Sequence, residues 1–421
     1  MSAVLDERPP TLRAGWYWTT MGEIAEVVGG GTPRTNDSTN FEGGDVPWIT
    51  PADLSGYAEK YISHGARFIT RKGLESSSAR LLPAGTVLFT SRAPIGYVAI
   101  ARNPVATNQG FKSFVLKDGV LPEYVYWWLK CSKQRAEALA SGTTFLELSG
   151  ASAKKLPIRI APIDEQRRIV AEIEKQISRL DEAVANLKRV VTRLAAYRQR
   201  ALDDAFASEP NAVLGQLISE GPQNGLYLPK GAYGSGTPIV RIDDYQTDWI
   251  RPVAELRRVR ATPSQVSTWA LQQGNVLVNR VNSMSHLGKC VVVPDVLAGA
   301  LFESNMMRFR LVPGVRPRYV ELYLGSRIGK RRLTANAKWA VNQASINQKD
   351  VQATEIPLPS LERQVQIVAE LDRRLSIVRE VEAEVDANLK RAQVLRRAVL
   401  TKAFAISTTI SPRVTARHRD V

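Results

Sequence analysis

Three stretches of this sequence contain residue types that could carry catalysis, and each lacks a group that the chemistry requires. Residues 103–106 (NPVA) begin like the Asn-Pro-Pro-aromatic signature of amino methyltransferases, but the second proline and the aromatic side chain that would clamp a flipped base are absent. Residues 294–295 (PD) with 303–305 (ESN) resemble a metal-dependent nuclease core, but Asn305 stands where a lysine would be needed to stabilise developing charge. Residues 29–36 (GGGTPRTN) lack the Gly-Lys-Ser/Thr of a nucleotide-binding P-loop, and they are predicted as a flexible surface loop without regular structure.

The histidines and cysteines give no better candidate for a catalytic or metal site. His64, His286 and His418 are far apart in sequence and match no metal-ligand spacing, so each is expected to be an ordinary surface or core residue. With only Cys131 and Cys290, a disulfide framework or a thiolate zinc site is disfavoured. We therefore expect no catalytic residues and no cofactor or metal on this chain.

Composition and charge indicate a binding protein with a polyanionic partner. A length of 421 residues gives room for two domains with large cores. The formal charge of +16 favours a polyanion. No run of about 18 uncharged apolar residues and no amino-terminal signal pattern is present, so we expect a cytoplasmic protein and favour nucleic acid over lipid as the partner. The charge alone also fits a basic protein that is simply soluble at high pI.

A long segment that occurs twice organises the chain. Residues 156–207 return from residue 356 at a constant offset of 198, which pairs Gln166 with Gln364 and residues 205–207 (AFA) with 403–405. Each copy opens with a proline-containing lead, which cannot continue a helix, and then runs for about forty residues without Gly or Pro. The sequence therefore predicts two long helices, within residues 156–207 and 356–406.

Apolar side chains recur along both segments at alternating steps of four and three residues, which is a heptad seam. Glu382 interrupts the second stripe. We expect the two helices to form an intramolecular coiled coil; the alternative is two ordinary amphipathic helices in two domains. The predicted seam residues are Ile173, Ile177, Leu180, Val184, Leu187, Val191, Leu194, Leu371, Leu375, Val378, Val385 and Leu389.

A globular block precedes each helix, at residues 1–155 and 208–355. In the first block, short strands are predicted at residues 46–50, 86–91, 97–101 and 112–116, with one helix at 123–139 and a short one at 21–27. Tyr124, Trp127 and Trp128 are spaced as on a core face rather than a base-stacking platform. The second block repeats this order of elements, and its residues 238–240 (PIV) correspond to residues 47–49 (PWI) of the first. The fold class is therefore α+β, and residues 407–421 form a tail of unknown role.

The ordered combination of these features resembles the specificity subunits of type I restriction–modification systems. It rests on the duplicated plan, the Gln-x-x-Ile-Val-Ala-Glu run within 157–172, the ANLKR runs at 185–189 and 387–391, and GGTP at 30–33. The likeness extends from about Gly15 to Phe404. Departures are Arg363 where the first copy has Glu165, Glu382 in the seam, and the tail.

This resemblance implies two target-recognition domains in a pseudo-twofold tandem repeat, separated by two long helices that form an antiparallel coiled coil. Each domain would read one half of a split sequence in double-stranded DNA, and the helices would set the spacing between the halves. The implied partners are two methyltransferase subunits, which carry S-adenosylmethionine, and two restriction subunits, the motor nucleases of the complex. Mg and ATP are likewise expected on partner subunits.

Under this hypothesis, recognition falls to arginine, lysine, asparagine and glutamine side chains on loops, because arginine can fork to guanine and asparagine or glutamine to adenine. The loops after corresponding strands differ between the blocks, at residues 90–96 and 279–288. Candidates for DNA binding are Arg34, Asn36, Arg92, Lys112, Arg241, Arg280, Asn282, Lys289, Lys330, Arg331 and Arg332. The last three form the densest basic run and are expected to contact the phosphate backbone of the DNA. For any one candidate, a phosphate contact or a solvated charge is the alternative.

A function of a different class also fits the sequence. A non-catalytic coiled-coil scaffold that binds protein or RNA would explain the long helices and would use the positive charge for assembly. Steep salt dependence combined with a preference for one split duplex would separate DNA recognition from this alternative.

Overall fold

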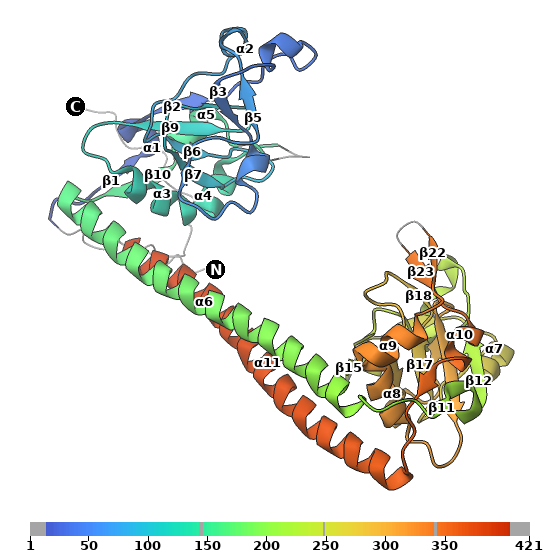
Figure 1. Cartoon of the computed structure of the whole chain (residues 1–421). Coiled ribbons are helices and arrows are strands. Elements are labelled where there is room, and N and C mark those ends of the chain that lie inside the picture. Colours follow the sequence, from blue (N-terminus) through green and yellow to red (C-terminus); the bar gives the residue numbers. More distant parts are fainter. Residues whose placement is uncertain (1–13, 143–145, 247–248, 341–342, 405–421) are drawn as a thin grey trace, which may run out of the picture. The chain divides into compact units, whose positions relative to one another are not determined.

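The computed structural model describes residues 14–142, 146–246, 249–340 and 343–404. Two compact units emerge from the contacts (Figure 1): residues up to Asn186 together with those from Leu389, and residues Leu187–Asn388. Each unit therefore contains one globular block, part of each long helix, and its own core.

The block of the first unit is built on two sheets. The five-stranded sheet has the spatial order β2 (Ala25–Gly29), β9 (Lys112–Leu116), β6 (Val87–Phe89), β7 (Val98–Ala101) and β4 (Tyr61–Ile62). The three-stranded sheet has the order β5 (Arg67–Ile69), β3 (Val46–Ile49) and β8 (Ala106–Thr107). A separate pair joins β1 (Tyr17–Thr20) to β10 (Pro157–Ile160). The four predicted strands are confirmed, because buried Val, Ile, Leu and Phe side chains dominate them.

The helices of this block are α1 (Met21–Ile24), α2 (Arg71–Glu75), α3 (Pro122–Lys130), α4 (Lys133–Leu139) and α5 (Gly150–Lys154). The prediction of one helix at 123–139 is wrong, because the chain leaves helical geometry at Ser132, with φ −99° and ψ 7°. The Ser132 hydroxyl donates to the Trp128 carbonyl at 2.8 Å, so a side chain satisfies an acceptor at the end of α3. The short helix predicted at 21–27 also ends early, because β2 begins at Ala25.

The predicted core face of α3 is confirmed at its two central aromatic residues. Tyr124 and Trp128 are fully buried, while Trp127 is half-buried. The Tyr124 hydroxyl donates to the Arg159 carbonyl at 2.7 Å, so the buried polar group is satisfied.

The second unit repeats this plan. Its sheets have the orders β12 (Ile218–Asn224), β21 (Met306–Leu311), β17 (Val276–Asn279), β19 (Cys290–Val292), and β16 (Arg257–Val259), β13 (Tyr233–Val240), β20 (Leu301–Phe302). Its helices are α7 (Pro263–Trp269), α8 (Pro317–Gly325), α9 (Arg327–Leu333) and α10 (Gln348–Gln352), and β11 (Ala212–Val213) pairs with β24 (Glu355–Ile356). Additional sheets are β14 (Tyr245–Gln246) with β15 (Trp249–Ile250), and β18 (Val281–Asn282), β23 (Gln343–Ser345), β22 (Lys338–Ala340). The α+β class and the duplication are confirmed.

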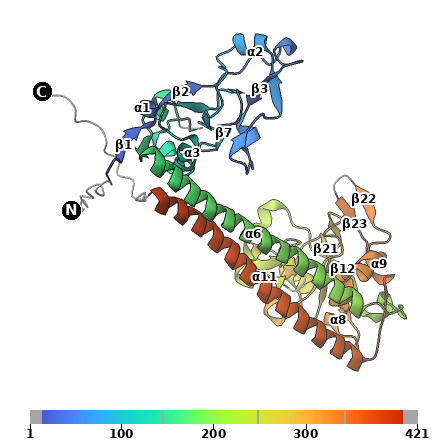
Figure 2. The same cartoon turned by 60° about the vertical axis from the view of Figure 1, so that its left-hand side comes forward.

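The two long helices are α6 (Ile163–Ala205), with 43 residues, and α11 (Leu361–Phe404), with 44 residues. In the first unit, Ile173 of α6 shares a core with Leu400 of α11. In the second unit, Leu202 near the end of α6 shares a core with Leu375 near the start of α11. The beginning of each helix thus packs beside the end of the other, and both views show the antiparallel pairing (Figures 1 and 2).

An aromatic residue at the end of each long helix closes the core of one unit. Phe404 packs edge-on against Tyr124 in the first unit, with ring centroids 5.3 Å apart. Phe206, just beyond α6, packs edge-on against Tyr319 of the second unit, also at 5.3 Å. The phenylalanine of the repeated triplet is therefore a packing element of the block that each helix reaches at its end.

Burial along the seam is uneven. The buried positions are Ile173, Ile177, Leu371, Leu375, Val378 and Val385, and the half-buried ones are Leu180, Val184, Leu187, Leu194 and Leu389. Val191 departs from the prediction, because it is 40% exposed. None of the described helices combines the length and the apolar run that a membrane crossing requires.

Candidate nucleic-acid interface

The glycine stretch after β2 is anchored by close backbone contacts. A Cβ added to Gly30 would lie 1.9 Å from the Asn108 carbonyl oxygen, and one added to Gly31 would lie 2.2 Å from the Ala79 backbone nitrogen. The Trp48 indole N–H donates to the Gly31 carbonyl at 3.0 Å. Residues 30–34 lack regular structure, as predicted, but the predicted surface position is wrong for Gly31, which is buried. Only glycine permits such an approach of two backbones.

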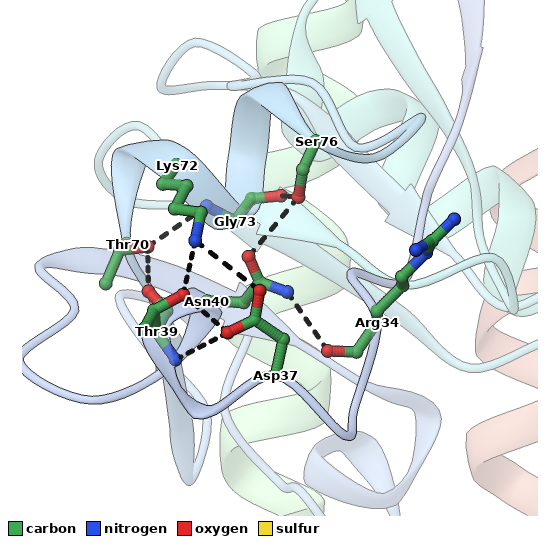
Figure 3. Close-up of polar contacts among 8 residues, drawn as sticks. All are labelled: Arg34, Asp37, Thr39, Asn40, Thr70, Lys72, Gly73 and Ser76. Carbon is green, nitrogen blue, oxygen red and sulfur yellow. Dashed lines mark hydrogen bonds and ion pairs between the residues drawn. The ribbon is translucent and has the colours of Figure 1, made fainter.

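Beyond this anchor the chain becomes exposed at Arg34 and Asn36. The buried Asn40 amide donates to the Arg34 carbonyl at 3.0 Å and accepts from the Ser76 hydroxyl at 3.4 Å. Figure 3 shows the Arg34 side chain directed away from this cluster. Asn40 thus fixes the backbone of Arg34 and leaves its guanidinium at the surface.

A second set of polar contacts fixes the adjoining 3-10 turn (Ser38–Asn40) to α2 (Figure 3). The Thr39 hydroxyl donates to Asp37 at 2.5 Å, and the Lys72 ammonium donates to that hydroxyl at 2.6 Å. The hydrogen bond from Thr39 lowers the pKa of Asp37 below its usual value. Thr70 caps α2 and donates to the Thr39 carbonyl at 2.9 Å. Sequence reasoning missed Lys72, because its partners lie more than thirty positions away in the chain.

The structure brings Arg92 and Lys112 together around an acid that the sequence did not single out. Arg92 Nη1 lies 3.7 Å from one Glu147 carboxylate oxygen, and Lys112 Nζ lies 3.9 Å from the other. Burial lowers the pKa of Lys112. Two neighbouring strands bring the two cations together, because Arg92 lies in the loop after β6 and Lys112 begins β9.

In the second unit a buried tyrosine shapes the loop between β17 and β19. The Tyr245 hydroxyl donates to the Asn279 side chain at 2.5 Å. The Asn279 backbone accepts from Gly288 at 3.0 Å and donates to Lys289 at 2.8 Å, which closes the loop. The Lys289 ammonium lies over the Tyr245 ring, 5.3 Å from its centroid. Burial lowers the pKa of Lys289.

Two further predicted residues, Arg280 and Asn282, lie in this loop, and a third, Lys330, contacts it from α9. Arg280 is half-buried and donates to the Ser304 carbonyl at 3.2 Å, while its buried Nε has no hydrogen-bond partner among the described residues. The Asn282 side chain accepts from the Ser283 backbone at 2.8 Å. Lys330 of α9 donates to the Ser285 carbonyl at 2.6 Å, so the structure brings Lys330 to the same loop.

The structure gives two predicted residues partners inside the block. Arg241 Nε donates to the Glu303 carboxylate at 3.0 Å, and Glu303 is buried. Arg332 Nη1 donates to the Tyr323 hydroxyl at 3.0 Å. Arg331, between Lys330 and Arg332, is exposed. The basic run is thus divided among three environments, because neighbours on a helix face different directions.

Sequence reasoning missed an exposed aromatic residue beside these groups. Trp339 on β22 is 72% exposed, and Lys338 precedes it. Trp339 pairs with Ala344 of β23, which in turn pairs with Asn282 of β18. Only the pairing of these three short strands, which the sequence does not reveal, places Trp339 two strands away from Asn282.

The remaining candidates for a metal or catalytic site are the acidic side chains, the cysteines and the three histidines. In the described ranges no group of three or more His, Cys, Asp or Glu side chains could hold a metal ion. His64 is exposed and stacks on Phe68, and His286 is exposed and contacts Ser283 and Ser285. His418 lies outside the described residues.

The family model of the type I restriction modification DNA specificity domain matches residues 14–193 and 230–390. The EcoKI specificity subunit of Escherichia coli K12 is 22% identical over 417 residues, covering 93% of this chain and 89% of that protein. The MjaIX specificity subunit of Methanocaldococcus jannaschii is 45% identical over 177 residues, which cover 41% of this chain and only 40% of that protein.

Solved structures share the fold. A chain from a structure describing complex assembly and conformational transition of a type I R-M system has a TM-score of 0.74 and 21% identity, covering 94% of this chain and 99% of that one. The HsdS subunit of Thermoanaerobacter tengcongensis has a TM-score of 0.55 and 20% identity, with 94% and 98% covered.

Proposed function

We propose that this chain, which belongs to the type I restriction–modification DNA specificity family, binds double-stranded DNA through its two globular blocks, each reading one half of a split sequence. One observation carries this proposal: the two blocks share one scaffold, but the loops after the equivalent strands β6 and β17 carry different side chains. A common scaffold with divergent cationic loops suits two binders of related but different targets.

The long helices supply the spacing in this proposal. At about 1.5 Å per residue, each helix is on the order of 60 Å long, which is far more than the core of one block needs. Half-sites about one duplex turn apart, near 34 Å, can be reached from one face of DNA by two linked domains. The lengths of α6 and α11 would therefore set the number of base pairs between the half-sites.

Chemistry in this proposal belongs to partner subunits. Two methyltransferase subunits would bring S-adenosylmethionine and methylate adenine, and two restriction subunits would bring ATP- and Mg-dependent motor and nuclease activity. This chain would recognise the target sequence and provide the surface on which the subunits assemble, and it would supply no catalytic group. Exposed apolar side chains on α11, including Ile377 at 51%, Val394 at 65% and Leu395 at 52%, support a helix surface that packs against other subunits.

The decisive experiment is to reconstitute this chain with its methyltransferase partner and map the methylated adenines in DNA that the complex has modified. We expect one split sequence, with a fixed spacer between its halves. Binding of matched and scrambled duplexes over a range of salt would be measured alongside. A complex that binds RNA as well as duplex DNA, or that shows no preferred duplex, would favour the scaffold alternative.

A further inference from the structure

We infer that Glu147 is a specificity-determining residue of the first block, and that it occupies, in the free protein, the place of a DNA phosphate between Arg92 and Lys112. The inference rests on the proposed function and adds to it a residue whose charge has the same sign as that of the DNA. Its consequence is weaker binding to generic DNA and a larger difference between generic and target DNA.

The geometry is that of two cations sharing one carboxylate without a hydrogen bond. The distances of 3.7 Å to Arg92 and 3.9 Å to Lys112 are those of ion pairs, and they exceed hydrogen-bond length. The side chains are 36% exposed for Arg92, 15% for Lys112 and 44% for Glu147. Arg92 and Glu147 therefore reach solvent, Lys112 does so only in part, and the described residues engage the donors of neither cation in a hydrogen bond.

Backbone contacts bring Glu147 to this place. Glu147 forms an isolated antiparallel bridge with Ser141, with backbone hydrogen bonds of 3.1 and 2.9 Å. The next residue, Leu148, is fully buried and donates its backbone N–H to the Ser91 carbonyl at 2.9 Å. Because Ser91 precedes Arg92, this hydrogen bond brings the backbones of Glu147 and Arg92 close together. The ion pairs with Arg92 and Lys112 then hold the carboxylate between the two cations.

The second unit provides an internal comparison. Ile346 donates to the Arg280 carbonyl at 2.9 Å, as Leu148 does to Ser91, so Ser345 is the structural counterpart of Glu147. Ser345 pairs there with Val281 and Lys338, and the loop cations Arg280 and Lys330 donate to backbone carbonyls. The first block therefore carries a negative charge at a point where the second carries a neutral hydroxyl.

A carboxylate in this place changes generic and specific binding unequally. A phosphate that approaches Arg92 and Lys112 must displace their contacts with Glu147 and is itself repelled by the carboxylate. On generic DNA this cost has no compensation, since phosphate contacts supply nearly all of the affinity. At the target, base contacts fix the register of the block, and in this inference that register holds the phosphates away from Glu147, so the cost is not incurred there. Glu147 thus lowers affinity where the sequence is wrong more than where it is right.

The test compares the complete complex with its Glu147→Gln variant, using the mapped target duplex and a duplex with both half-sites scrambled. We expect affinity for the scrambled duplex to rise roughly three- to tenfold, and its log–log salt slope to steepen by about one, because one more phosphate contact forms. Affinity for the target should change less, so the ratio of the two affinities falls. Glu147→Asp should retain most of the ratio of the parent protein.

Two controls keep this test specific. Glu26→Gln removes another acid that forms an ion pair, with Arg80 at 2.6 Å in the same block, and should leave the ratio unchanged. In a background of Arg92→Gln with Lys112→Gln, the gain from Glu147→Gln should disappear, because no cations remain to be released. Thermal unfolding of each variant complex checks that the block is folded.

Three outcomes would overturn the inference. Weaker binding of both duplexes by Glu147→Gln would make Glu147 a structural residue. Loss of target affinity with unchanged scrambled affinity would make it a direct reader, for example of the cytosine amino group. No change in either affinity would leave it without a role in binding. A parent complex without any preferred split duplex would overturn the proposed function itself, and the rise in generic affinity would still report on Glu147.

Discussion

Gln166 and Gln364 make the same three hydrogen bonds in the two units. The Gln166 side chain accepts from the Leu121 backbone at 2.9 Å and donates to the Ala161 and Gly119 carbonyls at 2.8 and 3.1 Å. Gln364 accepts from Arg316 at 2.9 Å and donates to the Pro359 and Gly314 carbonyls at 3.0 and 3.3 Å. Both side chains are buried. Each glutamine fastens the first turn of a long helix to the loop that enters α3 or α8.

Replacing either glutamine by alanine should destabilise the unit that contains it. The change removes three hydrogen bonds, each with a net contribution of roughly 0.5–1.5 kcal/mol, so we expect a loss of about 2–4 kcal/mol. Chemical denaturation of the chain measures the loss, and hydrogen exchange locates it. Gln366→Ala, at an exposed position of α11, is the matched control. Equal effects of Gln364→Ala and the control would show that the three hydrogen bonds contribute little.

Substitution of Arg280 by alanine should relax sequence choice in one half-site and leave the other unchanged. A fork to a base is worth roughly 1–3 kcal/mol of discrimination, which is about 5- to 150-fold in affinity. Methylation mapping with the variant complex measures the choice at each position. Arg331→Ala, at the exposed position of the basic run, should instead weaken all duplexes alike and reduce the salt slope by about one. A uniform loss for Arg280→Ala would identify a phosphate contact.

Inserting residues into the long helices should alter the spacer of the recognised sequence. Four residues add about 6 Å and shift the helical phase by about 40°, so an insertion in one helix should lengthen the spacer or abolish activity. Seven residues inserted in both helices preserve the seam and should lengthen the spacer with activity retained. Methylation mapping gives the spacer directly. An unchanged spacer in an active variant would contradict the proposal that the lengths of α6 and α11 set the distance between the half-sites.

Binding through the first block should weaken at alkaline pH before an ordinary lysine would lose its charge. Burial lowers the pKa of Lys112 below its usual value of 10.5, so the ammonium deprotonates earlier as pH rises. By the same shift, the folded state binds the proton less tightly than the unfolded chain, so this residue's contribution to stability increases as pH rises through the folded pKa. Affinity titrations from neutral to alkaline pH should show that Lys112→Arg retains binding longer than the parent. Lys155→Arg, at an exposed position, should follow the parent curve.

Local sequence patterns were sufficient for the repeated helices and for the aromatic core face of α3. The absence of Gly and Pro over forty residues and the alternating apolar steps express helix geometry directly, so α6 and α11 begin and end close to the predicted bounds. Tyr124 and Trp128 are four positions apart and therefore share one helix face. The break at Ser132 escaped prediction, because one side-chain hydrogen bond to Trp128 stabilises it and the apolar period does not change.

The individual binding residues depended on contacts between distant segments. Arg241 and Arg280 are both arginines near strand ends, yet one donates to the buried Glu303 and the other keeps a buried Nε without a partner among the described residues. The same holds for Glu147, whose position between Arg92 and Lys112 follows from its bridge to Ser141 and from the hydrogen bond of Leu148 to Ser91.

By itself, the sequence determined the duplication, the two helices, the α+β class and the positive charge, because composition and periodicity are properties of neighbouring residues. Only the tertiary structure decided that Phe404 closes the core around Tyr124 and that Phe206 does so around Tyr319. It also decided which cations reach solvent. The physical reason is that burial and ion pairing depend on which distant segments meet, and strand register and helix direction fix those meetings.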